Sequence, residues 1–232
     1  MNTMTAALVV FSGGQDSTTC LFWAKKHFNQ VVAIAFDYGQ RHIAELTAAK
    51  QIADEANVPL SIFKIDLLSS VSHNSLTDKQ MVVEADQSGH HPPNTLVEGR
   101  NMLFLTYAAI FAKTNGIRDL ITGVGQADYS GYPDCRNEFI ISLNKTLNLS
   151  MDYEYRIHTP LMWLDKSEIW HLADELGVFQ IVRDKTITCY HGIGGEGCGN
   201  CPSCQLRKRG LLKYLKSIDN GRFKEFGKEY FL

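Results

Sequence analysis

The sequence predicts an α/β fold, a doubly wound parallel sheet followed by a small module at the C-terminal end. Residues 6–11 and 31–36 are continuous apolar runs of strand length, as expected for strands buried on both faces of a parallel sheet. Four of the six cysteines fall within residues 189–204, which predicts a module at 186–232 behind a domain at 1–185. At 232 residues with 44% hydrophobic side chains, the chain is long enough to bury a large core.

The first apolar run leads directly into Ser-Gly-Gly-Gln-Asp-Ser at residues 12–17. Two adjacent glycines permit turns closed to other residues and let a ligand approach the backbone. We expect Asp16, Ser17 or Thr18 to cap a helix at 17–28, whose free N–H groups then face an anion such as phosphate. The motif lacks the lysine of GxxxxGK[ST] and the third glycine of GxGxxG. An ordinary Gly-Ser turn is the alternative.

The rest of the chain continues the alternation of helices and strands. An amphipathic helix with Ile43 and Ala56 on one face ends at Asn57 and Pro59. Strands are expected at 60–66, 119–124 and 157–163, and helices at 102–113 and 136–149. Asp165 and Glu168 form a capping box that opens a further helix, which ends at Gly177.

Residues 67–98 interrupt this alternation with a stretch rich in Ser, His, Asn, Gln and Gly. A polar stretch of this length predicts a functional lid or a disordered loop. His90 and His91 near its end are interpreted as solvated side chains rather than metal ligands.

Several polar or glycine positions follow predicted strands, where ligands bind in open α/β sheets. Tyr38 and Gln40 follow the second strand, and Gly123 follows the fourth. Arg100 begins a helix after a glycine and can form a planar fork to phosphate or carboxylate, with a surface ion pair as the alternative. Lys166 lies in a first helical turn and can add a point charge to a phosphate, although a solvated lysine fits the pattern nearly as well.

A loop at residues 128–136 combines aromatic rings, carboxylates, a hydroxyl, a glycine and a proline. Aromatic faces can stack a flat heterocycle while aspartates accept from its ring N–H and amino groups, which favours a purine-like ligand over a plain surface turn. Cys135 has no histidine beside it in sequence and is interpreted as a packed thiol. The candidate ligand-binding residues of this loop are Asp128, Tyr129, Ser130, Gly131, Tyr132 and Asp134.

The cysteine spacing predicts a metal site. Cys198, Cys201 and Cys204 form CxxCxxC, and Cys189 precedes them across a glycine-rich loop. Four thiolates complete a closed tetrahedral shell, so the metal is expected to be structural and the ion zinc. An iron–sulfur cluster and unliganded cysteines are the alternatives, and His191 is a weaker candidate ligand.

Charge and apolar length exclude several classes of partner. A formal net charge of −2 and a pI near 6.4 give no basic field for nucleic acid or an anionic membrane. The basic residues at 207–209 are therefore interpreted as a solvated helix rather than a phosphate-tracking face. The first apolar run is far shorter than the roughly 20 residues of a spanning helix. Small-molecule ligands and a cytoplasmic, unprocessed protein are expected, with residues 219–232 as a tail with aromatic anchors.

Residues 12–17 resemble SGGxDS, the signature of the PP-loop ATP pyrophosphatases, which split ATP between the α and β phosphates. Further motifs extend the resemblance over almost the whole chain to the 7-cyano-7-deazaguanine synthases of queuosine precursor biosynthesis. Glu98 departs from that pattern, which has a proline before GRN. The matching motifs are SGGQDS at 12–17, DYGQRH at 37–42, GRN at 99–101, TGV at 122–124, DYSGYPDC at 128–135, TPLMWLDKSE at 159–168 and the four cysteines.

The resemblance implies a Rossmann-like fold of the adenine nucleotide alpha hydrolase type, one structural zinc per subunit and a homodimer. It also implies a C–N bond-forming ligase that converts 7-carboxy-7-deazaguanine and ammonia to the 7-nitrile with ATP and Mg²⁺. Motifs and resemblance together assign ATP to Phe11, Ser12, Gly13, Gly14, Gln15, Asp16, Ser17, Thr18 and Gly123. They assign catalysis to Ser12, Asp16, Ser17, Arg100 and Lys166. They assign the deazapurine to Tyr38, Gln40, Asp128, Tyr129, Ser130, Gly131, Tyr132 and Asp134, and zinc to Cys189, Cys198, Cys201 and Cys204.

Two rival classes stay open from the residues alone. Another PP-loop enzyme, such as a tRNA thiolase or an amidating ligase, would share the ATP site. A thiolase is expected to carry a basic tRNA face and a catalytic cysteine pair. A zinc-dependent DNA-binding regulator is the alternative that is not an enzyme, and it would show salt-sensitive duplex affinity without ATP turnover.

Overall fold

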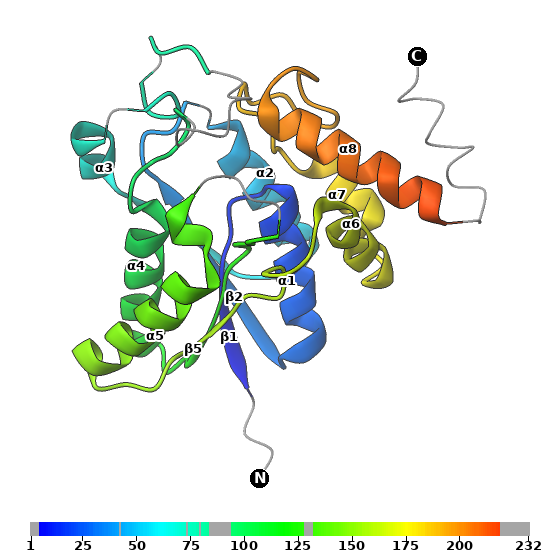
Figure 1. Cartoon of the computed structure of the whole chain (residues 1–232). Coiled ribbons are helices and arrows are strands. Elements are labelled where there is room, and N and C mark those ends of the chain that lie inside the picture. Colours follow the sequence, from blue (N-terminus) through cyan, green and yellow to red (C-terminus); the bar gives the residue numbers. More distant parts are fainter. Residues whose placement is uncertain are drawn as a thin grey trace.

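A parallel β-sheet forms the centre of the protein, as a computed structural model shows (Figure 1). The structure describes residues 5–41, 43–72, 74–78, 80–83, 94–127 and 132–218. Within them five strands pair in the order β3-β2-β1-β4-β5, and every pairing is parallel. The strands are β1 (Ala6–Val10), β2 (Gln30–Asp37), β3 (Leu60–Lys64), β4 (Asp119–Ile121) and β5 (Arg156–His158).

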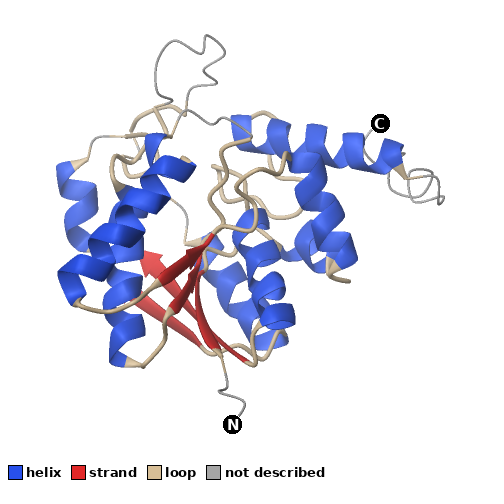
Figure 2. Ribbon diagram, turned by 60° about the horizontal axis from the view of Figure 1, so that its bottom comes forward, coloured by secondary structure: helices blue, strands red, loops and turns tan. Residues whose placement is uncertain are grey.

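Helices cover both faces of this sheet (Figure 2). Helices α1 (Gln15–His27) and α2 (Ala44–Glu55) pack on one face, and α4 (Arg100–Thr114) and α5 (Asn137–Met151) pack on the other. Alternate residues of β1 pack into the two helix layers, one on each face of the sheet, because successive strand side chains point to opposite faces. Val9 joins the α1 and α2 layer and Leu8 joins the α4 and α5 layer. This arrangement confirms the predicted doubly wound α/β fold.

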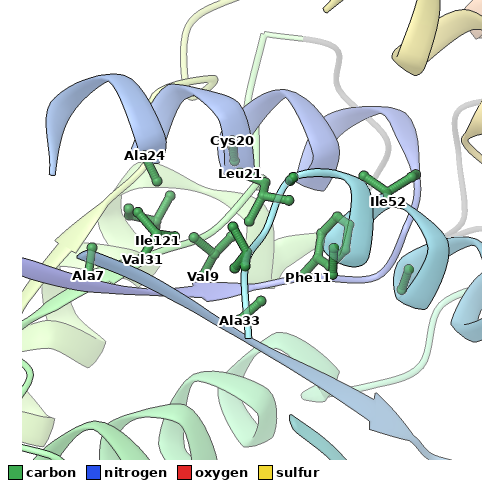
Figure 3. Close-up of a cluster of buried hydrophobic side chains, with 14 of the residues drawn as sticks. Ala7, Val9, Phe11, Cys20, Leu21, Ala24, Val31, Ala33, Ile52 and Ile121 are labelled. Carbon is green, nitrogen blue, oxygen red and sulfur yellow. The ribbon is translucent and has the colours of Figure 1, made fainter. Parts of the chain in front are cut away.

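The layer under α1 shows how the apolar runs form the core. Cys20, Leu21 and Ala24 of α1 lie over Val9 of β1 and Ile121 of β4 (Figure 3), and all of them are fully buried. Each buried side chain of this size contributes about 1–3 kcal/mol of transfer free energy. The continuous apolar character of β1 therefore follows from burial on both faces.

Four elements differ from the sequence expectation, the first being β4, which ends at Ile121 rather than near residue 124. Strand β3 ends at Lys64, and a short helix α3 (Asp66–Val71) occupies part of the stretch expected to be irregular. Strand β5 ends at His158 rather than near residue 163, because Pro160 has no N–H to donate to a neighbouring strand. Helix α7 (Phe179–Lys185) was not predicted, since its seven residues carry too little periodicity to stand out from a loop.

The C-terminal part joins helix α6 (Lys166–Glu175) and α7 to the long helix α8 (Pro202–Ser217). The predicted capping box is present, with the Asp165 carboxylate accepting from the N–H of Glu168 at 3.0 Å. Trp170, Phe179 and Leu211 belong to one buried cluster that spans the three helices. Helix α8 thus shares its core with α6 and α7, while the division at 185/186 stays a prediction.

The interpretation of residues 207–209 as a solvated helix is wrong for Arg207, which is only 6% exposed. Its Nη1 donates to Thr186 Oγ1 at 2.8 Å and to Thr188 Oγ1 at 3.1 Å. Its Nη2 donates to the carbonyl oxygens of Val182 and Arg183, each at 2.8 Å. A guanidinium has five N–H donors in a fixed fork, which suits it to join several segments that each present an acceptor.

The topology places a binding site at one edge of the sheet. Strand β1 lies between β2 and β4, and the chain winds outward from it in both directions, so the carboxyl ends of β1 and β4 flank the switch point where such sheets bind ligands. In the described ranges no helix is long and apolar enough to cross a membrane.

Candidate active site

The glycine turn after β1, residues 12–17, has the geometry expected of an anion-binding loop and no side-chain cap, and is called the anion-binding loop below. Helix α1 begins at Gln15 with Gly14 as its N-cap, and no side chain caps it. The predicted capping by Asp16, Ser17 or Thr18 is therefore wrong, because all three lie inside the helix. Among the described residues, the N–H groups of Asp16 and Ser17 donate to no acceptor outside residues 12–17. Free N–H groups at a helix start attract an anion.

Two glycines are sterically required around this loop. Gly13 has φ +82°, and a Cβ there would lie 2.6 Å from the carbonyl oxygen of Glu45 and 2.7 Å from the nitrogen of Ala49. A Cβ on Gly123, after β4, would lie 3.1 Å from the nitrogen of Ser17. The ends of β1 and β4 therefore meet without space for side chains, as expected at the switch point.

A cavity of about 750 Å³ opens above these strand ends. Twelve predicted site residues line it: Phe11, Ser12, Gly14, Gln15, Asp16, Ser17, Tyr38, Gln40, Arg100, Gly123, Tyr132 and Lys166. Gly13 and Thr18 support the loop from below without lining the cavity. Asp134 also stays behind the wall, where it accepts the N–H of Asn101 at 3.0 Å. Asp128, Tyr129, Ser130 and Gly131 lie outside the described residues.

Asp16 and Lys166 pair across the cavity wall. Lys166 Nζ lies 2.7 Å from both carboxylate oxygens of Asp16, and the lysine side chain is only 13% exposed. Lys166 is the first residue of α6, so this contact brings the start of α6 against the start of α1. The ammonium and the carboxylate neutralise each other, so the positive electrostatic potential at this end of the cavity comes from the free helix N–H groups.

Arg100 enters the cavity from the start of α4, which follows Gly99 in the left-handed conformation at φ 69°. Its Nη1 donates to Tyr38 Oη at 3.3 Å, and the guanidinium stands 5.9 Å from the centre of that ring. Gln40 instead stabilises its own turn, because its Oε1 accepts the N–H of Tyr38 at 2.9 Å. Tyr132 Oη lies 2.6 Å from Thr95 Oγ1. This part of the cavity wall is thus aromatic with one arginine.

Gln15 has a buried amide that is free to bind a polar ligand. Its side chain is 1% exposed and lines the cavity, yet neither its Oε1 nor its Nε2 has a hydrogen-bond partner among the described residues. A buried amide without partners costs about 1–3 kcal/mol per unsatisfied group. The free N–H groups of α1, the Lys166 ammonium and the Gln15 amide together fit a phosphate-bearing ligand with further polar atoms.

Several cavity residues escaped sequence reasoning. Thr188 Oγ1 accepts the N–H of Gln15 at 3.3 Å, and the N–H of Ile187 donates to Gly13 O at 3.1 Å. The segment before the cysteine cluster thus holds the anion-binding loop. Glu45 and Arg209 also line the cavity. Glu45 is a glutamate in a first helical turn, and Arg209 is one of three consecutive basic residues. Neither pattern indicates a binding site, because surface helices commonly carry both.

The cysteines gather as predicted. One donor atom each from Cys189, His191, Cys198 and Cys201 lies within 4.8 Å of the others. Cys204 Sγ is 3.3 Å from Cys201 Sγ and 4.0 Å from Cys198 Sγ. His191 thus joins three of the predicted thiols in one group of donors, and Cys204, the fourth, lies beside the group next to Cys201 and Cys198.

The backbone around the cluster suits thiolate ligands. The N–H of His191 donates to Cys189 Sγ and that of Cys201 to Cys198 Sγ, each at 3.3 Å. Burial raises the pKa of Cys198, but the N–H groups of Cys201 and Asn200 outweigh it and bring the pKa to about 6. Such donors stabilise the deprotonated sulfur that a metal needs.

The two other cysteines do not form a nucleophilic pair. Cys20 is buried in the α1 layer, and burial raises its pKa well above the usual value. Cys135 lines the cavity, but burial raises its pKa to about 11. Thiols with raised pKa values carry little thiolate at neutral pH, in agreement with the interpretation of Cys135 as a packed thiol.

Residues 6–215 match the family model described as "Queuosine biosynthesis protein QueC". The chain belongs to the QueC family. This confirms the resemblance drawn from the motifs and places the chain among enzymes of queuosine biosynthesis.

Named relatives within the QueC family cover nearly the whole chain. It is 58% identical over 217 residues to a 7-cyano-7-deazaguanine synthase of Parabacteroides distasonis, covering 93% of this chain and 97% of the relative. It is also 58% identical over 210 residues to one of Clostridium acetobutylicum, with 90% and 95% covered. A synthase of Bacteroides fragilis is 57% identical over 210 residues, with 90% and 96% covered.

Proposed function

We propose that this chain converts 7-carboxy-7-deazaguanine and ammonia to 7-cyano-7-deazaguanine with ATP, through adenylylated intermediates. Family membership supports the reaction class. The observation that carries the proposal is the anion-binding loop, where free N–H groups of α1 and the unpartnered Gln15 amide face the cavity beside Lys166.

The reaction requires two activations of oxygen as a leaving group. A carboxylate oxygen attacks the α phosphate of ATP, pyrophosphate leaves, and an acyl-adenylate forms. Ammonia then displaces AMP and loses a proton to give the amide. The amide oxygen attacks a second α phosphate, and the nitrogen loses two protons as pyrophosphate and then AMP depart. No protein nucleophile is needed, so catalysis rests on positioning and on stabilisation of phosphate charge.

We propose that ATP lies along Phe11 to Thr18 with Gly123 beneath it. Ser12 and Ser17 have hydroxyls 3.0 Å apart at the mouth of the loop, where they can donate to phosphate oxygens. Lys166 and Arg100 supply the positive charge that stabilises the departing pyrophosphate or orients the substrate carboxylate. When bound, Mg²⁺ neutralises phosphate charge, and Asp16 is the carboxylate placed to hold it.

The deazapurine is proposed to lie against the aromatic wall. Tyr38 and Tyr132 line the cavity, and their rings suit a flat heterocycle. The remaining residues proposed for this role are Asp134, which lies behind the cavity wall, and those at 128–131, which are outside the described residues. Gln40 is proposed to stabilise the turn that holds Tyr38 in the cavity wall, because its Oε1 accepts the N–H of Tyr38.

Zinc is the proposed metal of the cysteine cluster, held by the thiolates of Cys189, Cys198, Cys201 and Cys204. Four thiolates are a closed structural set for zinc. Metal analysis of the purified protein distinguishes zinc from an iron–sulfur cluster, which would also give visible absorption. One zinc per chain without iron is the expected result.

We also propose a cytoplasmic homodimer formed on the outer face of α4. Tyr107 is 45% exposed and Ile110 is 50% exposed on that face, and Phe63 at the neighbouring edge of β3 is 43% exposed. An apolar surface of this kind is typical of an interface. Ile110→Glu should give monomers in light scattering, whereas Lys50→Glu on the opposite layer should leave dimers.

The activity is tested by incubating the purified protein with ATP, ammonium and 7-carboxy-7-deazaguanine and weighing the products by mass spectrometry. Ser12→Ala and Asp16→Ala are expected to lower nitrile formation by about 10²-fold or more. Ser142→Ala, on the exposed face of α5, is the matched control. Wild-type rates in both loop variants would show that the loop has been assigned the wrong role, and sulfur transfer to tRNA would favour the thiolase alternative.

A further inference from the structure

Glu45 places an unpaired carboxylate in the cavity. It lies in the first turn of α2 and lines the cavity, and its backbone carbonyl abuts Gly13 of the anion-binding loop. Among the described residues its carboxylate makes neither a hydrogen bond nor an ion pair. A half-buried charge without a partner lowers the stability of the fold. Such groups are therefore typical of sites where they face a ligand.

Arg100 and Tyr38 are the charged and titratable groups that face Glu45 from α4 and from the end of β2. The Arg100 guanidinium is near enough to act on the carboxylate electrostatically, yet the two form no salt bridge. Desolvation dominates and raises the pKa of Glu45 to about 7, against the attraction of Arg100. Between carboxylate and guanidinium the cavity therefore has a negative and a positive wall.

We infer that Glu45 binds the ammonium ion and, as general base, delivers ammonia to the activated carboxyl carbon. The inference rests on the proposed function. Ammonium is a compact cation with four N–H donors, and a carboxylate that lacks partners is its natural acceptor. The substrate carboxylate then pairs with Arg100, so that the nitrogen and the carbon it attacks lie between two side chains of opposite charge.

The position of Glu45 favours ammonium over the donor edge of the heterocycle. The backbone carbonyl of Glu45 lies beside Gly13 of the anion-binding loop, where the α phosphate and the carboxyl oxygen must meet, and its side chain lines the same cavity. The amino edge of a deazapurine lies at the far end of the molecule from its carboxyl group. A carboxylate in this cavity would repel phosphate, so an anionic ligand does not explain it either.

The proton balance assigns Glu45 a defined step. Ammonium gives one proton to the Glu45 carboxylate and becomes neutral ammonia. The ammonia lone pair forms the C–N bond, the C–O bond to AMP breaks, and the second proton leaves the nitrogen for solvent. A carboxyl group with a pKa near neutrality both accepts this proton and releases it for the next turnover.

The test compares three reactions of the purified full-length protein. Carboxylate-dependent exchange of pyrophosphate into ATP reports adenylation alone. Amide and nitrile formation over a range of ammonium concentrations reports the nitrogen step. Hydroxamate formation from hydroxylamine, which is largely unprotonated at neutral pH, reports attack on the adenylate without the need for a base. Glu98→Gln removes the same charge from an exposed site on the approach to Arg100 and serves as the control.

Glu45→Gln should keep exchange and hydroxamate formation near wild type and lose about 10²-fold in kcat/KM for ammonium. Glu45→Asp, which restores the carboxylate, should recover part of that loss. Equal use of ammonium by Glu45→Gln and wild type overturns the inference, as does a parallel loss of all three reactions. A wild-type protein without exchange overturns the proposed function and this inference with it.

Discussion

Arg207→Met should strongly destabilise the protein, because this guanidinium joins α7, α8 and the segment before the cysteines. Four hydrogen bonds of 2.8–3.1 Å from Arg207 end on buried or half-buried oxygens. Thr188 Oγ1 also accepts from the N–H of Gln15, and the Val182 carbonyl also accepts from Thr186 Oγ1, so these two acceptors keep a donor. Each of the two acceptors left without a donor costs about 1–3 kcal/mol. We expect the free energy of unfolding to fall by about 3–5 kcal/mol, as for other broken buried charge networks.

Urea unfolding followed by tryptophan fluorescence and far-UV circular dichroism measures this change. For a chain of this length the same loss lowers the melting temperature by about 6–20 °C. Lys208→Met is the matched control, because Lys208 is the exposed neighbour on α8, and its effect should stay within about 0.5 kcal/mol. A fall below about 1 kcal/mol for Arg207→Met would refute the buried-network reasoning.

Three further predictions use positions where the structure offers a control. Gly197→Ala should abolish zinc binding in elemental analysis, because its Cβ would lie 2.3 Å from a cysteine sulfur, whereas Gly195→Ala, with nothing within 4 Å, should retain it. Gly13→Ala should weaken ATP binding in calorimetry by at least about 10-fold, a 1.4 kcal/mol effect, while Gly116→Ala, also at positive φ but in open space, should not. Asp119→Asn should cost about 1–3 kcal/mol at neutral pH. Burial raises the pKa of the Asp119 carboxyl, but hydrogen bonds from an arginine and a histidine outweigh burial and leave the pKa below its ordinary value of 3.8. The difference in stability from wild type should therefore disappear as the pH falls below 3.8 and the carboxylate is protonated.

The sequence predicted the sheet and the anion-binding loop because local chemistry determines both. Two-sided burial produces continuous apolar runs, and a glycine turn before a helix produces free N–H groups whatever surrounds them. Arg207 could not be distinguished from its basic neighbours, since only the return of the chain through α7 surrounds it with acceptors. The helix cap was misassigned by one turn because Gly14 begins the helix without side-chain help.

Glu45 and Thr188 show a second limit of sequence reasoning. The importance of each comes from a partner far along the chain, Gly13 in one case and Gln15 in the other. A first-turn glutamate and a threonine before a cysteine are common patterns with no chemistry of their own. Their place in the cavity exists only after the sheet has brought the start of α2 and the segment before α8 to the same edge.

Thr188 also connects the two parts of the chain that the motifs treat separately. Its Oγ1 accepts from the N–H of Gln15 and from the buried Arg207, and its carbonyl accepts from Ser203 Oγ at 2.8 Å. Cys189 follows it directly. A metal that fixes the cysteines therefore fixes the residue that holds the first turn of α1, and the free N–H groups keep the positions a phosphate needs. We therefore expect the cysteine cluster to influence catalysis through this segment.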